Sequence, residues 1–347
     1  MLLEAWLTLY EDTEFPGVIA RPMGAFNGKN DYHYQCVRCN VDLLKVIQLG
    51  LSLFSEDGET PPVSLQGEET NGRRNGTRAM EPIPHTWQFN FKFNLEDDMY
   101  SEVSIESLKQ AGVNFAVHDR DGIDPFEFGA LLIGSGLVCD EDVKWISFHG
   151  GYDFAYVTKL LRRLPLPDNG TEFEDDMKKF FPAIYDVKYL MKYSINAHSL
   201  GNLTPLDPQT TEVLMKFHEK SGLESLAENF KVKRQGAAHT AGSDSLLTGK
   251  LFFRIRDRIF NGEIHDDHIG NVWGLGLPEY NIHAASTLAY HAETPQPNGF
   301  TNGGPSTPNT GNARPVHTPN NSGPRGIQPM TPGGGGGVFG AFDLSRQ

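Results

Sequence analysis

The sequence is short of cysteine, of basic residues and of long apolar runs. Its 347 residues include three cysteines, too few for a disulfide framework, and Cys36 with Cys39 lacks the second pair that a tetrahedral zinc site needs. Lys and Arg total 30 against 44 Asp and Glu, giving a net charge of -14. This balance excludes nucleic-acid binding through a broad basic surface, so any such contact must be local.

Membrane insertion and secretion are also disfavoured. No run approaches the ~18 apolar residues of a membrane span. The apolar start, Met1 to Leu9, contains Glu4 and has no basic residue ahead of it, which is not the pattern of a signal peptide. We therefore expect a soluble intracellular protein with reduced thiols and no membrane partner.

Two acids lie in the segment DTEFPG. The stretch from Trp6 to Phe15 has the pattern of a strand, and side chains two residues apart on a strand leave the same face. Asp12 and Glu14 should therefore project together.

Two further acids lie on the apolar faces of predicted helices. Asp153 begins a run whose apolar residues follow at offsets of three, four, seven and eleven: Tyr156, Val157, Leu160 and Leu164. Asp244 is followed by apolar residues at offsets of three, seven and eleven: Leu247, Leu251 and Ile255. This spacing is that of a buried helical stripe, so both carboxylates should point inward.

Inward-facing carboxylates need a counter-charge. An uncompensated buried charge costs several kcal/mol, and Lys and Arg are scarce around these motifs. Divalent metal is the better counter-charge, and all-oxygen ligation suits Mg²⁺ or Mn²⁺ rather than zinc. Any one of these acids taken alone is more often a helix cap or a surface residue, but three elements that each direct acids inward favour a metal site.

Six sequence strings carry a family resemblance: DTEFPG, RCNVDLLKVIQLGL, WQFNFKFNL, WISFHGGYDF, FPAIYDVKYLM and AGSDSLLTG. In this order they resemble the poly(A)-specific deadenylase subunits of the Ccr-Not complex, members of the DEDD exonuclease superfamily. The match runs from about residue 10 to residue 277. The resemblance implies a ribonuclease H-like α/β fold with a mixed central sheet flanked by helices.

The resemblance also implies an activity, 3′-to-5′ hydrolysis of poly(A) that releases 5′-AMP. Asp12, Glu14, Asp153 and Asp244 match the four metal-binding acids, which would hold two Mg²⁺ or Mn²⁺ ions. His239 matches the histidine of the histidine subtype and would act as general base; its plainer interpretation is a loop histidine bonded to backbone. The implied partners are poly(A) 3′ ends and the scaffold and other subunits of the Ccr-Not complex, in cytoplasm and nucleus.

Three other residues lie close to these motifs. Phe15 and His149 each stand beside a predicted ligand and are candidates for contacting the terminal nucleotide, although such residues are more often structural, Phe15 as core and His149 as a strand-end residue. Asp186, in IYDVKYL, we interpret as structural or as supporting the ligands.

The expected elements alternate between strands and helices. We predict strands at Val46 to Phe54, Trp87 to Phe93, Trp145 to His149 and Ile184 to Tyr189. Helices are predicted from Ser101, around Pro125 to Ser135, and at the two acid-bearing stripes and SLAENF. Residues 1–285 should form one exonuclease domain with insertions at about 60–85 and 194–213. Residues 286–347, rich in Pro, Gly, Asn and Thr, should not fold.

The resemblance differs at the start of the chain. Only eleven residues precede Asp12, and Glu11 stands directly before it, whereas the family begins with a helix and an apolar strand. An N-terminal piece is thus expected to be missing. Two alternatives to the deadenylase remain: a non-catalytic adaptor of the same complex and a DEDD exonuclease acting on another nucleic acid.

Overall fold

The computed structural model describes residues 8–60, 85–275 and 316–317. Its centre is a five-stranded sheet of order β3-β2-β1-β5-β6, in which β1 pairs antiparallel with β2 and parallel with β5. The strands are β1 (Thr8–Glu14), β2 (Gln48–Phe54), β3 (Thr86–Asn90), β5 (Lys144–Ser147) and β6 (Ala183–Asp186). The expected α/β class with a mixed sheet is confirmed.

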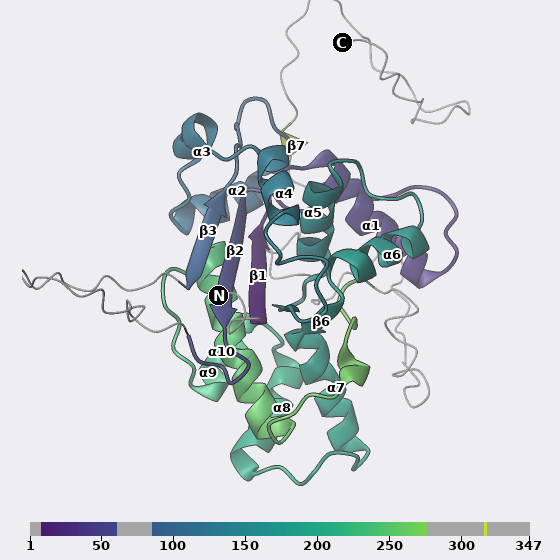
Figure 1. Ribbon diagram of the computed structural model, residues 1–347, viewed down its shortest axis with the longest axis vertical. Coiled ribbons are helices and arrows are strands. Elements are labelled where there is room, and N and C mark those ends of the chain that lie inside the picture. The colour runs from purple at the N-terminus through teal and green to yellow at the C-terminus, as the bar shows by residue number, and fades with distance from the viewer. Residues whose placement is uncertain (1–7, 61–84, 276–315, 318–347) are drawn as a thin grey trace, which may run out of the picture.

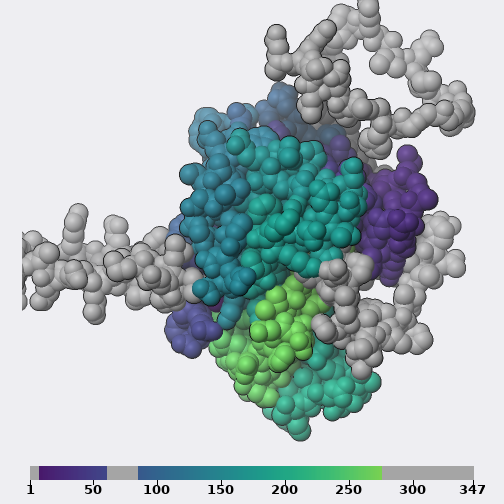
Figure 2. All heavy atoms as spheres, turned by 45° about the vertical axis from the view of Figure 1, so that its right-hand side comes forward, coloured from purple at the N-terminus to yellow at the C-terminus, as the bar shows by residue number. Residues whose placement is uncertain are grey.

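Helices cover both faces of this sheet (Figure 1). One apolar core lies under α1 (Lys29–Leu43), α4 (Pro125–Ile133), α5 (Gly151–Arg162) and α6 (Gly170–Phe180). The second lies under α7 (Val187–Ser199), α8 (Pro208–Glu219), α9 (Leu223–Phe230) and α10 (Ala241–Ile259). A third, smaller core involves α2 (Glu102–Gln110) and α3 (Phe115–Asp121). In the space-filling view α1 (purple) forms one flank and the green segment that includes α10 lies below the teal helices (Figure 2).

The central strand β1 serves both cores because its side chains alternate. Leu9 is buried in the core under α5, whereas Tyr10 is buried in the core under α10 and its ring lies 6.0 Å from that of Phe252. The period of two continues to the end of the strand. Glu11 and Thr13 therefore face α5, while Asp12 and Glu14 face α10.

Helix α10 crosses the sheet at very close range. Asp12 pairs with Gly50 of β2, and a Cβ on Gly50 would lie 1.9 Å from the carbonyl oxygen of Ala241, the first residue of α10. Only glycine leaves room for this approach. The backbone amides of Ala241 and Gly242 donate to the side chains of Gln48 and Gln88 at 3.4 and 3.2 Å, which fixes the beginning of α10 against β2 and β3.

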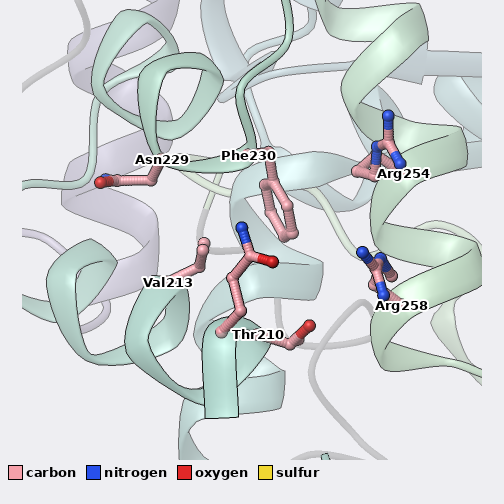
Figure 3. Close-up of a pocket in the computed structure, with 7 residues that line it drawn as sticks. Thr210, Val213, Asn229, Phe230, Arg254 and Arg258 are labelled. Atoms are coloured by element: carbon pink, nitrogen blue, oxygen red, sulfur yellow. The ribbon is translucent and has the colours of Figure 1, made fainter. Parts of the chain in front are cut away.

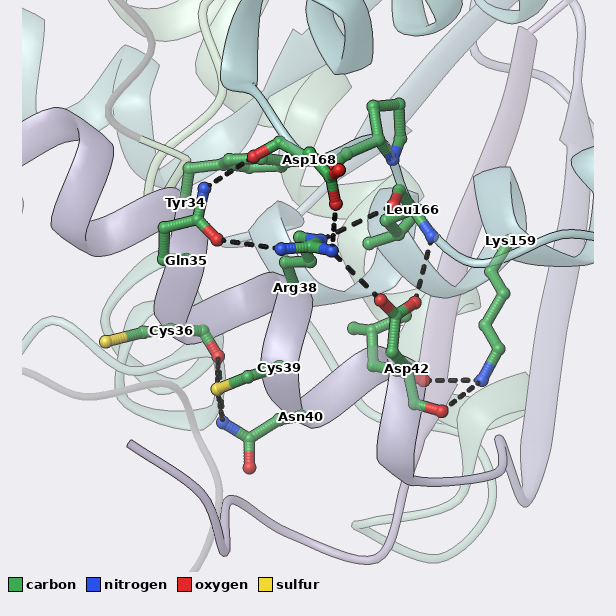
Figure 4. A network of polar contacts seen from close by, with 12 residues as sticks. Tyr34, Gln35, Cys36, Arg38, Cys39, Asn40, Asp42, Lys159, Leu166 and Asp168 are labelled. Atoms are coloured by element: carbon green, nitrogen blue, oxygen red, sulfur yellow. Dashed lines mark hydrogen bonds and ion pairs between the residues drawn. The ribbon is translucent and has the colours of Figure 1, made fainter. Parts of the chain in front are cut away.

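Polar contacts anchor α5 to α1 on the other face (Figure 4). Lys159 of α5 donates to the backbone carbonyls of Val41 and Leu44 at 2.6 and 3.2 Å. These carbonyls end α1 and have no partner within the helix. The carboxylate of Asp42 accepts from the backbone amide of Leu166 at 2.9 Å. Helix α5 therefore has a fixed position relative to the sheet.

The structure corrects several expected boundaries. The strand expected to run to Tyr189 ends at Asp186, because the Asp186 carboxylate accepts from the Tyr189 amide at 2.8 Å and caps α7. Leu164 is not part of the buried stripe but 61% exposed, because the chain leaves α5 through Arg163 in a left-handed conformation. The proposed insertion at 194–213 contains the end of α7 and the beginning of α8.

The expectations for the other variable segments are tested less fully. Within the tail, Val316–His317 forms a two-residue strand, β7, that pairs antiparallel with β4 (Tyr100–Ser101). The rest of the tail and nearly all of the 60–85 insertion lie outside the described residues. Among the helices of the described part, none is long and apolar enough to cross a membrane.

Candidate active site

Three of the four predicted metal-binding acids meet at the end of β1. Asp12, Glu14 and Asp244 each offer a carboxylate oxygen, and these oxygens lie within 4.8 Å of one another. Asp12 and Glu14 come from the α10 face of β1, and Asp244 from the first turn of α10. The close approach at Gly50 brings these two elements together.

Asp153, the fourth acid, comes from α5 on the opposite face and lies outside this group of three. One of its carboxylate oxygens accepts from the backbone amide of Thr13 at 3.0 Å and from the Thr13 hydroxyl. Thr13 stands between Asp12 and Glu14 in the sequence. Asp153 therefore holds the segment that carries the other two acids, in addition to adding its own charge.

The four carboxylates oppose one another's ionisation. Burial raises the pKa of Asp12 well above its ordinary value, and the charges of Asp244 and Asp153 raise it further. The pKa of Glu14 is raised well above its ordinary value by the same causes. Burial raises the pKa of Asp153 to about 6, against the hydrogen bonds from Thr13. Such a group is stabilised in its charged form by a nearby cation.

Arg234 is a site residue that the sequence did not suggest. Its guanidinium forms an ion pair with Asp244 at 2.5 Å and another with Glu224 at 2.7 Å, and it donates to the Ser243 hydroxyl at 3.0 Å. Although Lys and Arg are scarce around the acid motifs, this one arginine balances part of the charge of Asp244. Arg234 lies in the loop between α9 and α10, where no periodic pattern predicts the direction of a side chain.

His239 lies in the same loop, just before α10. Its backbone is in the left-handed region, with φ 60°, and its side chain is exposed to solvent. Burial raises the pKa of Asp244, while Arg234 and His239 lower it. The histidine therefore stands beside the carboxylate cluster, on its solvent side.

The two candidate nucleotide contacts have other partners in the structure. Phe15 is 7% exposed and stacks on Tyr152 with ring centroids 5.2 Å apart. His149 accepts from the Lys188 ammonium at 3.1 Å through Nδ1, and burial, followed by the charge of Lys188, lowers the pKa of His149 to about 3. Packing accounts for most of the surface of Phe15, and His149 is held as a neutral imidazole.

A second group of acids lies beneath the site on the α5 face. Asp186 is fully buried and accepts from the Gly150 amide at 2.9 Å, so it fixes the turn that begins α5. Glu11 is also fully buried, and neither carboxylate oxygen has a hydrogen-bond partner among the described residues. Burial and the charges of Asp153 and Asp186 raise the pKa of Glu11 well above its ordinary value.

A mixed sheet covered by helices on both faces, with a carboxylate cluster at the end of its central strand, is the ribonuclease H-like fold of the DEDD exonucleases. Residues 129–252 match the model of the CAF1 family ribonucleases. The chain is 42% identical to the poly(A) ribonuclease pop2 of Schizosaccharomyces pombe, over 79% of this chain and 70% of that protein. It is 36% identical to CCR4-NOT transcription complex subunit 7 of Caenorhabditis elegans, over 82% and 81% of the two chains. The chain belongs to the CAF1 ribonuclease family.

Solved structures agree with this assignment. A structure of S. pombe Pop2p with Mg²⁺ and Mn²⁺ bound has a TM-score of 0.63 and 42% identity, over 79% of this chain and 92% of that one. A structure of the yeast NOT1 MIF4G domain co-crystallised with CAF1 has a TM-score of 0.56 and 30% identity, over 78% and 89%.

Proposed function

We propose that this protein shortens the poly(A) tails of mRNA from the 3′ end as a subunit of the Ccr-Not complex, releasing 5′-AMP. The observation that carries the proposal is the convergence of Asp12, Glu14 and Asp244 within 4.8 Å, with Asp153 bonded to the same strand. No acid of the four is lost, which favours an enzyme over a non-catalytic adaptor. The S. pombe relative is a poly(A) ribonuclease.

The donor set fits divalent Mg²⁺ or Mn²⁺. Three carboxylates with raised pKa values and one nearby arginine leave excess negative charge in a site made of hard oxygen ligands, and the S. pombe Pop2p structure has both metals bound. We propose Asp12, Glu14, Asp153 and Asp244 as the ligands. Bound metal would activate water and neutralise charge on the phosphate.

His239 is our candidate for the general base. Its imidazole is open to solvent beside Asp244, where it can accept the proton of a water molecule that attacks the terminal phosphodiester. Arg234 holds Asp244 through its ion pair. Asp153 keeps Asp12 and Glu14 in place through Thr13. Of the two predicted nucleotide contacts, His149 is the better candidate, because it is half-buried whereas Phe15 is buried.

The experiment is incubation of the purified protein with a 5′-labelled A20 oligonucleotide and a mixed-sequence control, with Mg²⁺ or with EDTA. The expected result is stepwise shortening of A20 from a free 3′ hydroxyl, release of 5′-AMP, slower attack on the control, and no reaction in EDTA. An intact A20 in the presence of Mg²⁺ would favour the adaptor, and faster cleavage of DNA would favour another DEDD exonuclease.

The outer face of α4 is our candidate for the contact with the complex scaffold. Phe128 and Leu132 face the core, whereas Phe126, Leu131 and Ile133 are exposed apolar residues on the same short helix. An exposed apolar surface of this kind is typical of an interaction site, and the related yeast protein was co-crystallised with the MIF4G domain of NOT1.

An Ile133→Asp variant tests this contact. It should lose co-purification with a NOT1-type MIF4G domain while still shortening A20, and Leu200→Asp, at an exposed leucine of another surface, should retain both. Retention of the scaffold by Ile133→Asp would exclude this face. As subunits of that complex act on mRNA, we also propose a cytoplasmic and nuclear location.

A further inference from the structure

A cleft of about 500 Å³ runs along α10 beside the loop that joins α9 to α10. Four cationic residues line it, namely Lys231 and Lys233 of the loop and Lys250 and Arg254 of α10. Two carboxylates, Asp57 and Asp257, also line it. Four cations against two anions leave an excess of two positive charges in a chain whose net charge is -14.

The four cations are not used in ion pairs within the described part of the chain. Arg234 and Arg256, which lie close by, pair with Asp244 and Asp257, whereas Lys231, Lys233, Lys250 and Arg254 form no ion pair with any described carboxylate. Lys231, Lys233 and Arg254 are exposed. These side chains are therefore available to an anionic ligand.

The cleft shares the α9–α10 loop and helix α10 with the catalytic site, although none of the four acids lines it. Gln235 lines it and directly follows Arg234, the partner of Asp244; the Gln235 carbonyl accepts from Ser243 at the beginning of α10 at 2.7 Å. Lys250 and Arg254 lie six and ten residues beyond Asp244 on this helix, ~9 Å and ~15 Å along its axis at ~1.5 Å per residue. At ~3.4 Å per phosphate of one strand, this length corresponds to about four nucleotides.

The floor of the cleft is unsuited to reading bases. Its aromatic residue, Phe253, is 8% exposed, and the guanidinium of Arg256 covers the ring at 4.7 Å. A second cavity, beyond Arg254, is lined by Phe230, Asn229 and Arg258 (Figure 3). Its volume is about 30 Å³, enough for water but not for a base. Charge, and not stacking, is what the cleft offers.

We propose that this cleft binds the phosphate backbone of the RNA, on the 5′ side of the nucleotide being removed. The inference rests on the proposed nuclease function and adds the path of the substrate. A chain of net charge -14 repels RNA over most of its surface, so a local row of unpaired cations next to the acids determines where the strand lies. Contact through phosphates predicts binding that depends on length and salt but not on base.

The test compares Lys231→Gln/Lys233→Gln/Lys250→Gln with the matched variant Lys92→Gln/Lys109→Gln/Lys220→Gln, which removes three exposed lysines from other surfaces. Binding of 5′-fluorescein A20 and U20 is measured by anisotropy in EDTA over a range of salt. The cleft variant should bind both ~10-fold or more weakly. Its slope of log K against log salt should fall by about two, at ~0.7 per phosphate contact for single strands. The matched variant should bind as the wild type does.

Kinetics give a second readout. With Mg²⁺, the ratio of kcat/KM for A20 to kcat/KM for A3 should fall ~10-fold in the cleft variant, because only the longer strand reaches Lys250. The double variant Lys231→Gln/Lys233→Gln changes only exposed residues and should not affect folding. A smaller fall of the same kcat/KM ratio in this variant would show that the effect of the triple variant is not due to misfolding.

Several results would overturn the proposal. Unchanged binding of A20 by the triple variant would do so, as would an equal loss of kcat/KM on A3 and on A20. Tighter binding of a labelled poly(Glu) peptide than of A20, lost in the triple variant, would show that the cleft binds an acidic peptide instead of RNA. RNA binding by the cleft can be tested separately from the nuclease activity. If A20 binding in EDTA depends on the three lysines, the cleft binds RNA even when the protein does not cleave A20.

Discussion

The two faces of β1 carry acids in opposite circumstances. On the α10 face, Asp12 and Glu14 are half-buried and meet Asp244 and its partner Arg234. On the α5 face, Glu11 is fully buried without a hydrogen-bond partner among the described residues. Burial and like charges raise the pKa values on both faces. The first group can be neutralised by a cation that enters from solvent, whereas burial favours the protonated form of Glu11.

The largest expected effect is loss of a carboxylate on the α10 face. Asp12→Ala should abolish nucleotide release and leave the EDTA-treated protein as stable as the wild type or more so, because it removes charge repulsion without breaking a side-chain hydrogen bond among the described residues. Asp244→Ala should also abolish release, with a smaller gain in melting temperature because Arg234 loses one of its two ion pairs. Single-turnover assays and thermal melts check both. Residual activity above a tenth of wild type in Asp12→Ala would contradict the site.

The next effect is expected at His239. His239→Ala should lower the chemical step ~100-fold or more, since loss of a positioned base typically costs about 10²- to 10⁴-fold. Mg²⁺ and A20 binding should persist, because the side chain is exposed and outside the carboxylate group. Isothermal titration with Mg²⁺ and single-turnover rates over pH separate the two. A full rate with an unchanged pH profile would exclude the general-base role.

A stabilising substitution is expected on the α5 face. Glu11→Met should raise the free energy of unfolding by about 1–3 kcal/mol, the usual cost of a buried polar group without a partner. Glu11→Gln is the matched control, because it removes the ionisable carboxyl but keeps unpaired polar atoms at the same place, and it should gain less stability. Urea titrations at pH 7 measure both. A destabilised Glu11→Met would mean that the carboxyl has a partner outside the described residues.

The smallest effect is on pH dependence without metal. The pKa values of Asp153 and Asp186 are raised to about 6, against ~3.9 for an unfolded Asp, so between these values the folded state binds more protons than the unfolded state. The free energy of unfolding should therefore fall as pH rises from 4 to 6. In EDTA the melting temperature should be a few degrees lower at pH 7 than at pH 5.

Mg²⁺ should reverse this trend, because it binds the deprotonated ligands. Melts across this range with and without Mg²⁺ make the comparison. Equal melting temperatures in EDTA and in millimolar Mg²⁺ at pH 7 would contradict the metal site.

Errors in the expected elements came from local interactions that periodicity does not register. The strand predicted at Ile184 to Tyr189 ends at Asp186, because the Asp186 carboxylate caps a helix at that point. Leu164 fits the helical offset, but α5 ends at Arg162 and the left-handed backbone of Arg163 turns the chain out of the helix, which leaves Leu164 exposed. Arg234 lies in a loop, so its ion pair with Asp244 depends on a chain path that no pattern describes.

The sequence alone determined the face that each acid takes. A period of two directs Asp12 and Glu14 to the same side of β1, and helical offsets direct Asp153 and Asp244 inward, because these directions follow from backbone geometry within one element. Distances between elements are set by packing. The tertiary structure decided that α10 approaches β2 closely enough at Gly50 to bring Asp244 to Asp12. It also decided that Asp153 reaches the same strand from the opposite face.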